Sequence, residues 1–153
     1  MDFKYKSIVT VTTCIIFIFL AFKLSDTIPF HGDEFYTLDI KNIPKPILYK
    51  TIISWYMEGL EVGSDSIFLL RFSSIIFALI GISFFLWHIP KNFHELSLAS
   101  LLLLSNSFIL MDSILFRYYS FYFLTSVLFF IYIFRWSKGL STNTNIFISI
   151  TGL

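Results

Sequence analysis

Long apolar runs constrain this chain more than any other feature of its sequence. Four of them are separated by short polar segments, and they cover residues 8–22, 67–89, 96–111 and 118–134. A helix rises about 1.5 Å per residue and a bilayer core is about 30 Å thick, so about 20 apolar residues can cross it. We therefore predict an all-α membrane protein with a single transmembrane domain over 1–153. In this prediction about four helices cross the membrane, and a fifth begins near residue 146.

The composition agrees with a membrane protein and excludes some functions. The chain is 56% hydrophobic and 20% aromatic, and only 14% of its residues are charged, unlike a water-soluble domain. Its net charge is +1 and its basic residues are scattered, which argues against nucleic acid as a partner. His31, His88 and His94 lack the paired spacing of metal ligands, although this leaves a divalent metal requirement open. The single cysteine, Cys14, cannot form an intrachain disulfide.

Basic residues indicate how the chain is oriented. Lys4 and Lys6 precede the first apolar run, and the positive-inside rule places them in the cytoplasm. The basic residues of the other short loops then fall on the same side: Lys91, Arg135 and Lys138. The first run also fits a signal peptide, but residues 21–23 lack the small-x-small cleavage pattern, so we favour an uncleaved anchor. We predict a multi-pass protein with a cytoplasmic N-terminus and one large external loop, 23–66.

The external loop is expected to carry short helices at the membrane interface. Pro44 and Pro46 end any helix that begins earlier in the loop, and a further helix is predicted over 47–57. A narrow polar stripe with four-residue spacing runs along this helix: Lys50, Ser54 and Glu58. Its apolar remainder is long enough to bury and too short to cross a bilayer. We predict that it lies flat on the outer surface, with its axis steeply inclined to those of the spans.

Two adjacent carboxylates, Asp33 and Glu34, follow closely after the first predicted span. A charge in hydrocarbon loses its solvation, so carboxylates near a bilayer need water, a cation or a partner. We interpret the pair as an extracytoplasmic functional site. A solvated loop in which Asp33 caps a short helix explains the same residues equally well.

Two arginines lie near the outer ends of predicted spans. Arg71 is one turn inside 67–89, where it either snorkels to the interface or points into a polar cavity and holds an anion. Arg117 opens the fourth span, and Asp112 can pair with it across a tight turn. The third span carries small polar residues suited to close packing between membrane helices: Ser97, Ser100, Ser105, Asn106 and Ser107.

The order of these features resembles a known family. A first span, an external loop that opens with Asp33-Glu34 and an amphipathic helix come first. A span entered through residues 69–73 and an outer turn that ends in Arg117-Tyr118-Tyr119-Ser120 follow. This order is similar to the N-terminal part of the C-type (GT-C) membrane glycosyltransferases related to protein O-mannosyltransferases and lipid A aminoarabinose transferases. The resemblance covers most of the chain but a third or less of such an enzyme.

The resemblance implies an inverting transfer of one sugar from a polyprenyl-phosphate donor to an extracytoplasmic glycan, lipid or protein. Asp33 corresponds to the residue that acts as base or orients the acceptor, and Glu34 supports it. Arg117, in the R-x-Y motif with Tyr119, corresponds to a residue that binds the donor phosphate, and Arg71 is a further basic candidate. The implied ligands are the lipid-linked sugar and membrane lipids, with no other cofactor indicated.

A second class of function fits the same residues. A non-catalytic multispanning protein or an inactive remnant needs Asp33-Glu34 only as a helix cap. Residues 146–153 begin an apolar run too short to cross a bilayer, so we expect the N-terminal part of a longer protein or a truncated reading frame. As such a fragment it should show no turnover alone. Further spans after Leu153 would favour the enzyme, and a genuine stop there would favour the alternative.

Overall fold

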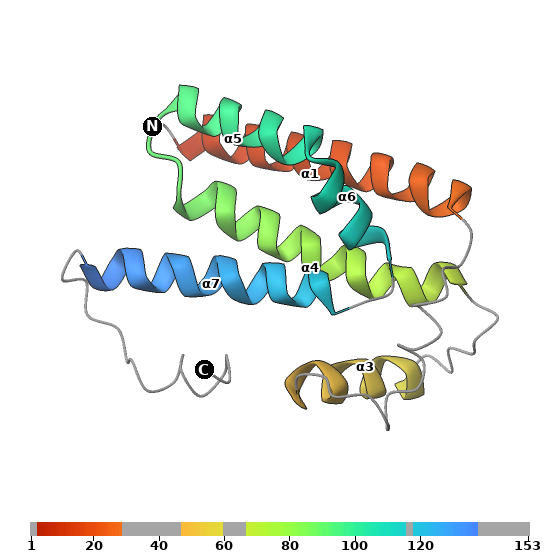
Figure 1. The fold of residues 1–153 in the computed structure, drawn as a ribbon. Helices are drawn as coiled ribbons and strands as arrows, with labels where there is room; N and C mark the ends of the chain where they lie inside the picture. The colour runs from red at the N-terminus through yellow and green to blue at the C-terminus, as the bar shows by residue number, and fades with distance from the viewer. Residues whose placement is uncertain (1–2, 29–46, 60–66, 116–117, 138–153) are drawn as a thin grey trace.

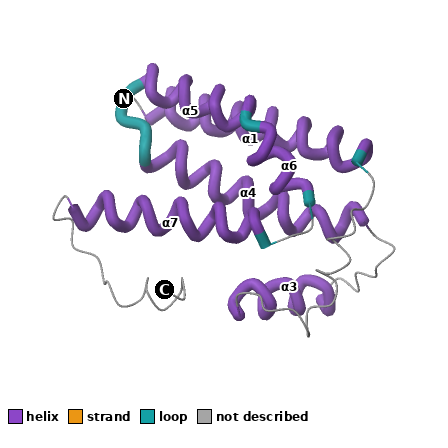
Figure 2. Tube along the Cα trace, in the orientation of Figure 1, coloured by secondary structure: helices purple, strands orange, loops and turns teal. Residues whose placement is uncertain are grey.

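The computed structural model of the chain describes residues 3–28, 47–59, 67–115 and 118–137. These residues form six α-helices and no strand. Figures 1 and 2 show how the helices are arranged. The helices are α1 (Phe3–Thr27), α3 (Ile47–Gly59), α4 (Ile67–His88), α5 (Phe93–Ser105), α6 (Ser107–Ile114) and α7 (Tyr119–Ser137). The prediction of an all-α protein is confirmed over this part of the chain.

Two of the described helices are long and apolar enough to cross a membrane. The qualifying segments are Phe3–Ser25 of α1 and Leu69–His88 of α4, and the bent pair α5–α6 adds a third if it forms one span. The apolar part of α7, Tyr119–Phe134, is shorter. Large apolar side chains stay exposed on α1 and α5, among them Phe19 and Leu101, which suits a surface that faces lipid. The described residues thus contain two to three candidate spans, and the predicted four are not confirmed.

Helix α4 lies between α7 on one side and α1 with α5 and α6 on the other (Figure 1). Helices α1 and α4 run antiparallel, because Arg71 contacts Ser25 near one end and Lys6 contacts Pro90 at the other. The core that α1 and α4 share with α5 and α6 consists of buried apolar side chains: Phe17, Ala21, Ile75, Ala78, Ile82, Leu86, Leu96, Leu103 and Ile114. We call the end at which α1 stops and α4 starts the Thr27 end. The sequence predicts that this end is extracytoplasmic.

The predicted third span, 96–111, is divided into two helices at Asn106. Asn106 ends α5 and also caps α6, and its side-chain oxygen accepts hydrogen bonds from the backbone N–H groups of Phe108 and Ile109 at 3.0 and 3.2 Å. An asparagine cap satisfies the free N–H groups of a new helix, so the chain can change direction there. The two helices are bent by 59°. The range therefore does not form one straight helix.

Helix α7 begins half-way along α4 and not beside its first turn. The rings of Phe121 and Phe77 lie 5.5 Å apart between centroids, and Ser120 and Ala78 line one cavity. Because α4 starts at Ile67, this level lies about 16 Å inside the Thr27 end. The sequence predicted a start at the outer end. The reason for the difference is that α6 has 8 residues and is bent by 59° from α5, so it advances only about 6 Å along the bundle.

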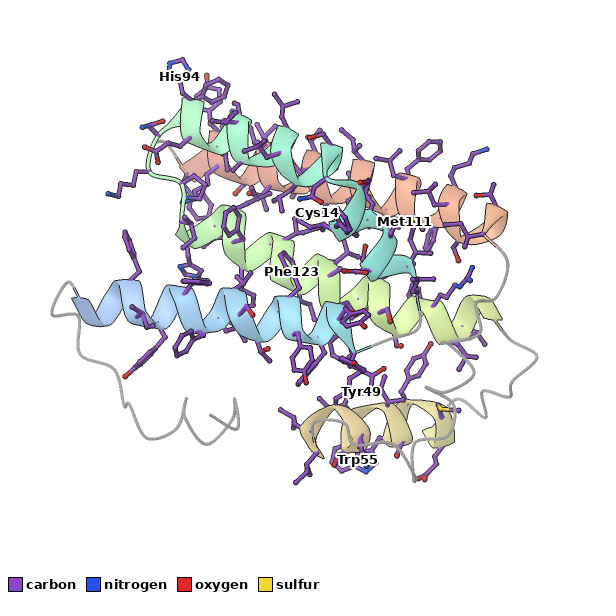
Figure 3. The ribbon with its side chains drawn as sticks, in the orientation of Figure 1. Cys14, Tyr49, Trp55, His94, Met111 and Phe123 are labelled. Carbon is purple, nitrogen blue, oxygen red and sulfur yellow. The ribbon has the colours of Figure 1, made fainter. Side chains whose placement is uncertain are left out.

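Helix α3 packs along the Thr27-end half of α4. Tyr49 contacts Phe77 with ring centroids 6.4 Å apart, and the hydroxyl of Tyr56 donates a hydrogen bond to the carbonyl of Leu69. Residue numbers rise in α3 as they fall in α4, so the helices run antiparallel over about 10 Å. Figure 3 shows Tyr49 pointing toward the bundle and Trp55 pointing away. The sequence predicted that the axis of this helix is steeply inclined to the spans. These contacts instead align α3 with α4, because the buried Tyr49 side chain packs α3 against α4 and α7.

The close approach of α4 and α7 depends on Gly81. A Cβ atom at Gly81 would lie 2.8 Å from the ring of Phe123 and 3.4 Å from the Cα atom of Leu124. We expect Gly81→Val to lower the free energy of unfolding by about 1–3 kcal/mol, the usual cost of overpacking. At Gly59 a Cβ would meet nothing within 4 Å, so Gly59→Val should cost about 0.5 kcal/mol or less. Thermal unfolding in detergent compares the two variants, and equal losses would contradict the packing explanation.

Candidate functional site

A small cavity lies between α6 and α7 at the level where α7 begins. Its volume is about 120 Å³, enough to hold water molecules. Ala78 of α4 and Phe123 of α7 form part of its apolar wall. Its polar lining comes from α6, its cap and the first turn of α7: Asn106, Asp112, Ser113, Tyr119 and Ser120. Ser113 and Ser120 are buried, and buried polar side chains in an apolar bundle are costly, so the cavity is a candidate site.

The polar groups of the cavity differ in how they are satisfied. The Ser113 hydroxyl contacts the carbonyls of its own helix, Ile109 at 2.6 Å and Leu110 at 2.9 Å. Ser120 is 2% exposed, and its hydroxyl has no hydrogen-bond partner in the structure. A buried hydroxyl without a partner is unfavourable. The Ser120 hydroxyl therefore has hydrogen-bonding capacity that the fold leaves unused.

Tyr119 is the first residue of α7 and lines the same cavity as Asn106, where α5 and α6 are divided. It is 37% exposed and contacts the ring of Tyr118 at 4.8 Å between centroids. Asp112 lines the same cavity from α6. The structure thus brings Tyr119, predicted to act at the donor phosphate, together with a carboxylate. It places Tyr119 half-way along α4 and not at the Thr27 end.

Arg71 is fully buried and ties α4 to the end of α1. Its Nη1 donates hydrogen bonds to the carbonyls of Ser25 and Ile28, each at 2.8 Å. Its exposed fraction is 0%, so the side chain does not snorkel to the surface of the fold. The last carbonyls of a helix carry partial negative charge and lack helical partners, which makes a cation there favourable. These contacts give Arg71 a structural role, and its predicted phosphate contact stays a prediction.

The other predicted site residues, Asp33, Glu34 and Arg117, lie outside the described residues. Their neighbours along the chain are described. Arg71 fixes Ile28, five residues before Asp33, and α7 begins at Tyr119, two residues after Arg117. The described elements therefore fix the chain shortly before Asp33 and shortly after Arg117.

The tyrosines of α3 remain neutral at ordinary pH. Helix α3 lies outside the candidate spans, and burial raises the pKa of both Tyr49 and Tyr56 by desolvation. The Tyr49 ring also contacts Tyr118 and Phe121 at the start of α7. Since a phenol with a raised pKa stays protonated well above neutrality, we expect the packing of α3 on the bundle to be insensitive to pH in the physiological range.

No group of three or more His, Cys, Asp or Glu side chains converges within the described residues. Cys14 lies in α1, where its thiol is 3.3 Å from the hydroxyl of Ser83 on α4. This contact joins two packed helices. It gives Cys14 no evident reactive role.

Sequence reasoning missed the cavity and two of its residues. It treated Asn106 as a packing residue, and it gave Ser120 no role beyond the Arg117-Tyr118-Tyr119-Ser120 motif. The signal that could have revealed the break is Ser105-Asn106-Ser107 in an otherwise apolar run, since Asn and Ser favour caps over helix interiors. No sequence signal places Asn106 and Ser120 around one cavity, because their relative position depends on the angle of α6.

Comparisons with known proteins identify no relative. No family model, no curated protein and no solved structure matches the chain. The resemblance to C-type glycosyltransferases therefore depends on the order of its residues alone.

Proposed function

We propose that the chain forms part of the membrane domain of a glycosyltransferase that takes its sugar from a polyprenyl-phosphate donor. Its N-terminus lies in the cytoplasm and its Thr27 end on the extracytoplasmic side. The observation that supports this best is the cavity between α6 and α7, whose wall includes the buried polar side chains of Ser113 and Ser120, since polar groups buried in an apolar bundle are costly. A lipid-linked substrate is a ligand that needs a polar site beside hydrocarbon.

The broken helix supports the same proposal. Helix ends leave backbone groups without helical partners, so breaks at membrane depth occur where they are buried in protein or line a cavity. Here the break at Asn106 and the start of α7 at Tyr119 line one cavity. A bundle that served only as an anchor would have no need of this arrangement.

In the proposed reaction, Asp33 and Arg117 have different roles. The Asp33 carboxylate takes the proton of the acceptor as it attacks the sugar carbon, and Glu34 supports it. The bond between that carbon and the phosphate oxygen breaks with inversion. The Arg117 guanidinium stabilises the negative charge that grows on the departing phosphate through charge-assisted hydrogen bonds. Arg71 acts in this proposal by fixing the end of α1 before the carboxylate loop.

Loss of Arg117 is expected to weaken binding of the donor lipid. A charge-assisted hydrogen bond contributes about 1.5–3 kcal/mol, so Arg117→Ala should raise the Kd for polyprenyl phosphate about 10- to 150-fold. The measurement is native mass spectrometry of the full chain in lipid nanodiscs, with the phosphate-free polyprenol as the reference ligand. Wild type should prefer the phosphate, and the variant should lose this preference.

Lys23→Ala serves as the control for general charge. Lys23 is exposed and close to the Thr27 end of α1, so its loss should leave the preference for polyprenyl phosphate unchanged. Equal binding of the phosphorylated and phosphate-free lipids by wild type would contradict the proposed function. It would favour a non-catalytic membrane protein.

A further inference from the structure

An apolar groove lies between α1 and α4, near the end at which α1 begins and α4 stops. We call this the Phe3 end, and the sequence predicts that it is cytoplasmic. The groove has a volume of about 280 Å³ and is lined by Thr10 of α1 and by four residues of α4: Ser83, Phe84, Trp87 and His88. We infer that this groove binds an acyl chain of an anionic phospholipid whose phosphate contacts Lys6. The inference does not depend on the proposed function.

The surface of the groove is apolar although two of its residues carry hydroxyls. The Thr10 hydroxyl is buried without accessible surface, and the Ser83 hydroxyl is 3.3 Å from the thiol of Cys14. Phe84 is 40% exposed, so its ring contributes to the open surface of the groove. Such a surface offers no hydrogen bond to a polar ligand, but it can be covered favourably by hydrocarbon. A lipid chain therefore suits this groove better than a polar small molecule.

Lys6 lies at one end of the groove. It precedes Thr10 by four residues, so the two lie on the same face of α1. The Lys6 ammonium is 5.8 Å from the centre of the Trp87 ring, and it donates a hydrogen bond to the carbonyl of Pro90 at 3.3 Å. An ammonium has three N–H donors, and this is its one hydrogen bond within the part of the chain that the structure describes. Oxygens of a phosphate can accept the others.

Aromatic side chains indicate that Lys6 lies at the depth of lipid head groups. The ring of Trp87 contacts the ring of Phe3 with centroids 5.2 Å apart, and tryptophan is enriched where a membrane meets water. Thr10 lies about 6 Å farther along α1, toward the middle of the bundle. A phospholipid has the same order of parts, because its phosphate lies at the interface and its chains extend toward the bilayer centre. The lysine and the groove thus match the phosphate and the chain.

The charge at this end of the groove favours an anionic lipid over a zwitterionic one. The carboxylate at the same end of the bundle, Glu95, accepts hydrogen bonds from the backbone N–H of Lys91 and the side-chain amide of Asn92, each at 2.7 Å. It therefore serves the start of α5, and Lys6 keeps its positive charge for a ligand. A zwitterionic lipid carries a cation beside its phosphate, so it gains less from the Lys6 ammonium.

The test compares two phospholipids with identical acyl chains. The probes are phosphatidylglycerol, which has a net negative charge, and phosphatidylcholine, which is zwitterionic. Each is titrated onto the full chain in detergent, and native mass spectrometry measures the Kd. We expect wild type to prefer phosphatidylglycerol. Lys6→Gln should reduce this preference about fivefold, the usual effect of one basic residue at an anionic membrane surface, and Lys6→Arg should retain it.

Two further variants separate the phosphate contact from the chain contact. Lys91→Gln is the matched control for charge, because the Lys91 ammonium lies at the same end but 5.6 Å from the centre of the Phe134 ring on α7. It should leave the preference unchanged. Phe84→Ala removes part of the groove wall, so it should weaken the binding of both lipids and leave their ratio unchanged.

Each contrary outcome overturns a stated part of the inference. If wild type binds the two lipids equally, or if Lys6→Gln keeps the full preference, Lys6 does not hold the phosphate. An equal loss in Lys91→Gln would mean that the Phe3 end attracts anionic lipid without a specific site. If Phe84→Ala leaves both affinities unchanged, the chain does not lie in the groove. If wild type binds neither lipid, the groove is not a phospholipid site and is left to a protein segment.

Discussion

Asp33→Asn is expected to lower the rate of sugar transfer by about 10²- to 10⁴-fold, the usual contribution of a general base. Asparagine keeps the shape of aspartate but cannot take a proton, so the change affects the transition state and not the bound donor. We therefore expect kcat to fall while the Kd for the glycosylated lipid stays within about twofold of wild type. Transfer from a radiolabelled polyprenyl-phosphate sugar in vesicles that contain the complete protein measures the rate.

Glu34→Gln is the comparison for this prediction. Glu34 is assigned a supporting role, so its loss should reduce transfer less than the loss of Asp33. Near-normal transfer by Asp33→Asn would remove Asp33 from the catalytic role and favour the helix-cap interpretation. A variant that loses donor binding together with transfer would point to damage of the fold.

The sequence predicts helices well where length and apolar content decide them. The runs 8–22 and 67–89 correspond to α1, Phe3–Thr27, and α4, Ile67–His88, and the helix predicted over 47–57 corresponds to α3. Each of these segments is apolar along its length or is bounded by proline, so local chemistry determines its start or its extent. Helix α1 is longer than the apolar run 8–22 at both ends, because polar residues at helix ends can remain helical in water.

The angle between α5 and α6, and the level at which α7 begins, cannot be predicted from the sequence in this way. The run 96–111 has the same mean apolarity whether it is one straight helix or two helices that meet at Asn106. The chain bends at the Asn106 cap, so α6 is inclined to α5. Because of this bend, α7 begins at the level of Ala78. The cavity follows from that angle and from contacts between residues distant in the chain. Sequence periodicity therefore predicts the helices but not the site.

Arg71 shows the same limit for a single side chain. Its position near a span end allowed either an interfacial or an anion-binding role. The observed partners, Ser25 and Ile28, are 46 and 43 residues away in sequence. They are backbone carbonyls, so no side-chain pattern could have identified them. Contacts of this kind depend on the antiparallel packing of α1 on α4.

Replacement of Arg71 by methionine is expected to have the largest effect on stability. Methionine fills part of the space but donates no hydrogen bond, so the carbonyls of Ser25 and Ile28 lose the guanidinium. A buried acceptor left without a partner costs about 1–3 kcal/mol, and the two together should lower the free energy of unfolding by about 2–6 kcal/mol. Chemical unfolding in detergent micelles, followed by circular dichroism, measures this loss.

Arg71→Lys distinguishes the contribution of the positive charge from that of the guanidinium's hydrogen-bond geometry. The ammonium keeps the positive charge near the negative end of the α1 dipole, but it is a compact charge on a flexible stem and lacks the planar fork that holds two acceptors. We expect it to recover less than half of the lost stability. Lys23→Met, which removes an exposed charge at the same end of α1, should change stability by about 0.5 kcal/mol or less. If Arg71→Met were as stable as wild type and bound polyprenyl phosphate more weakly, Arg71 would belong to the donor site and not to the anchor of α1.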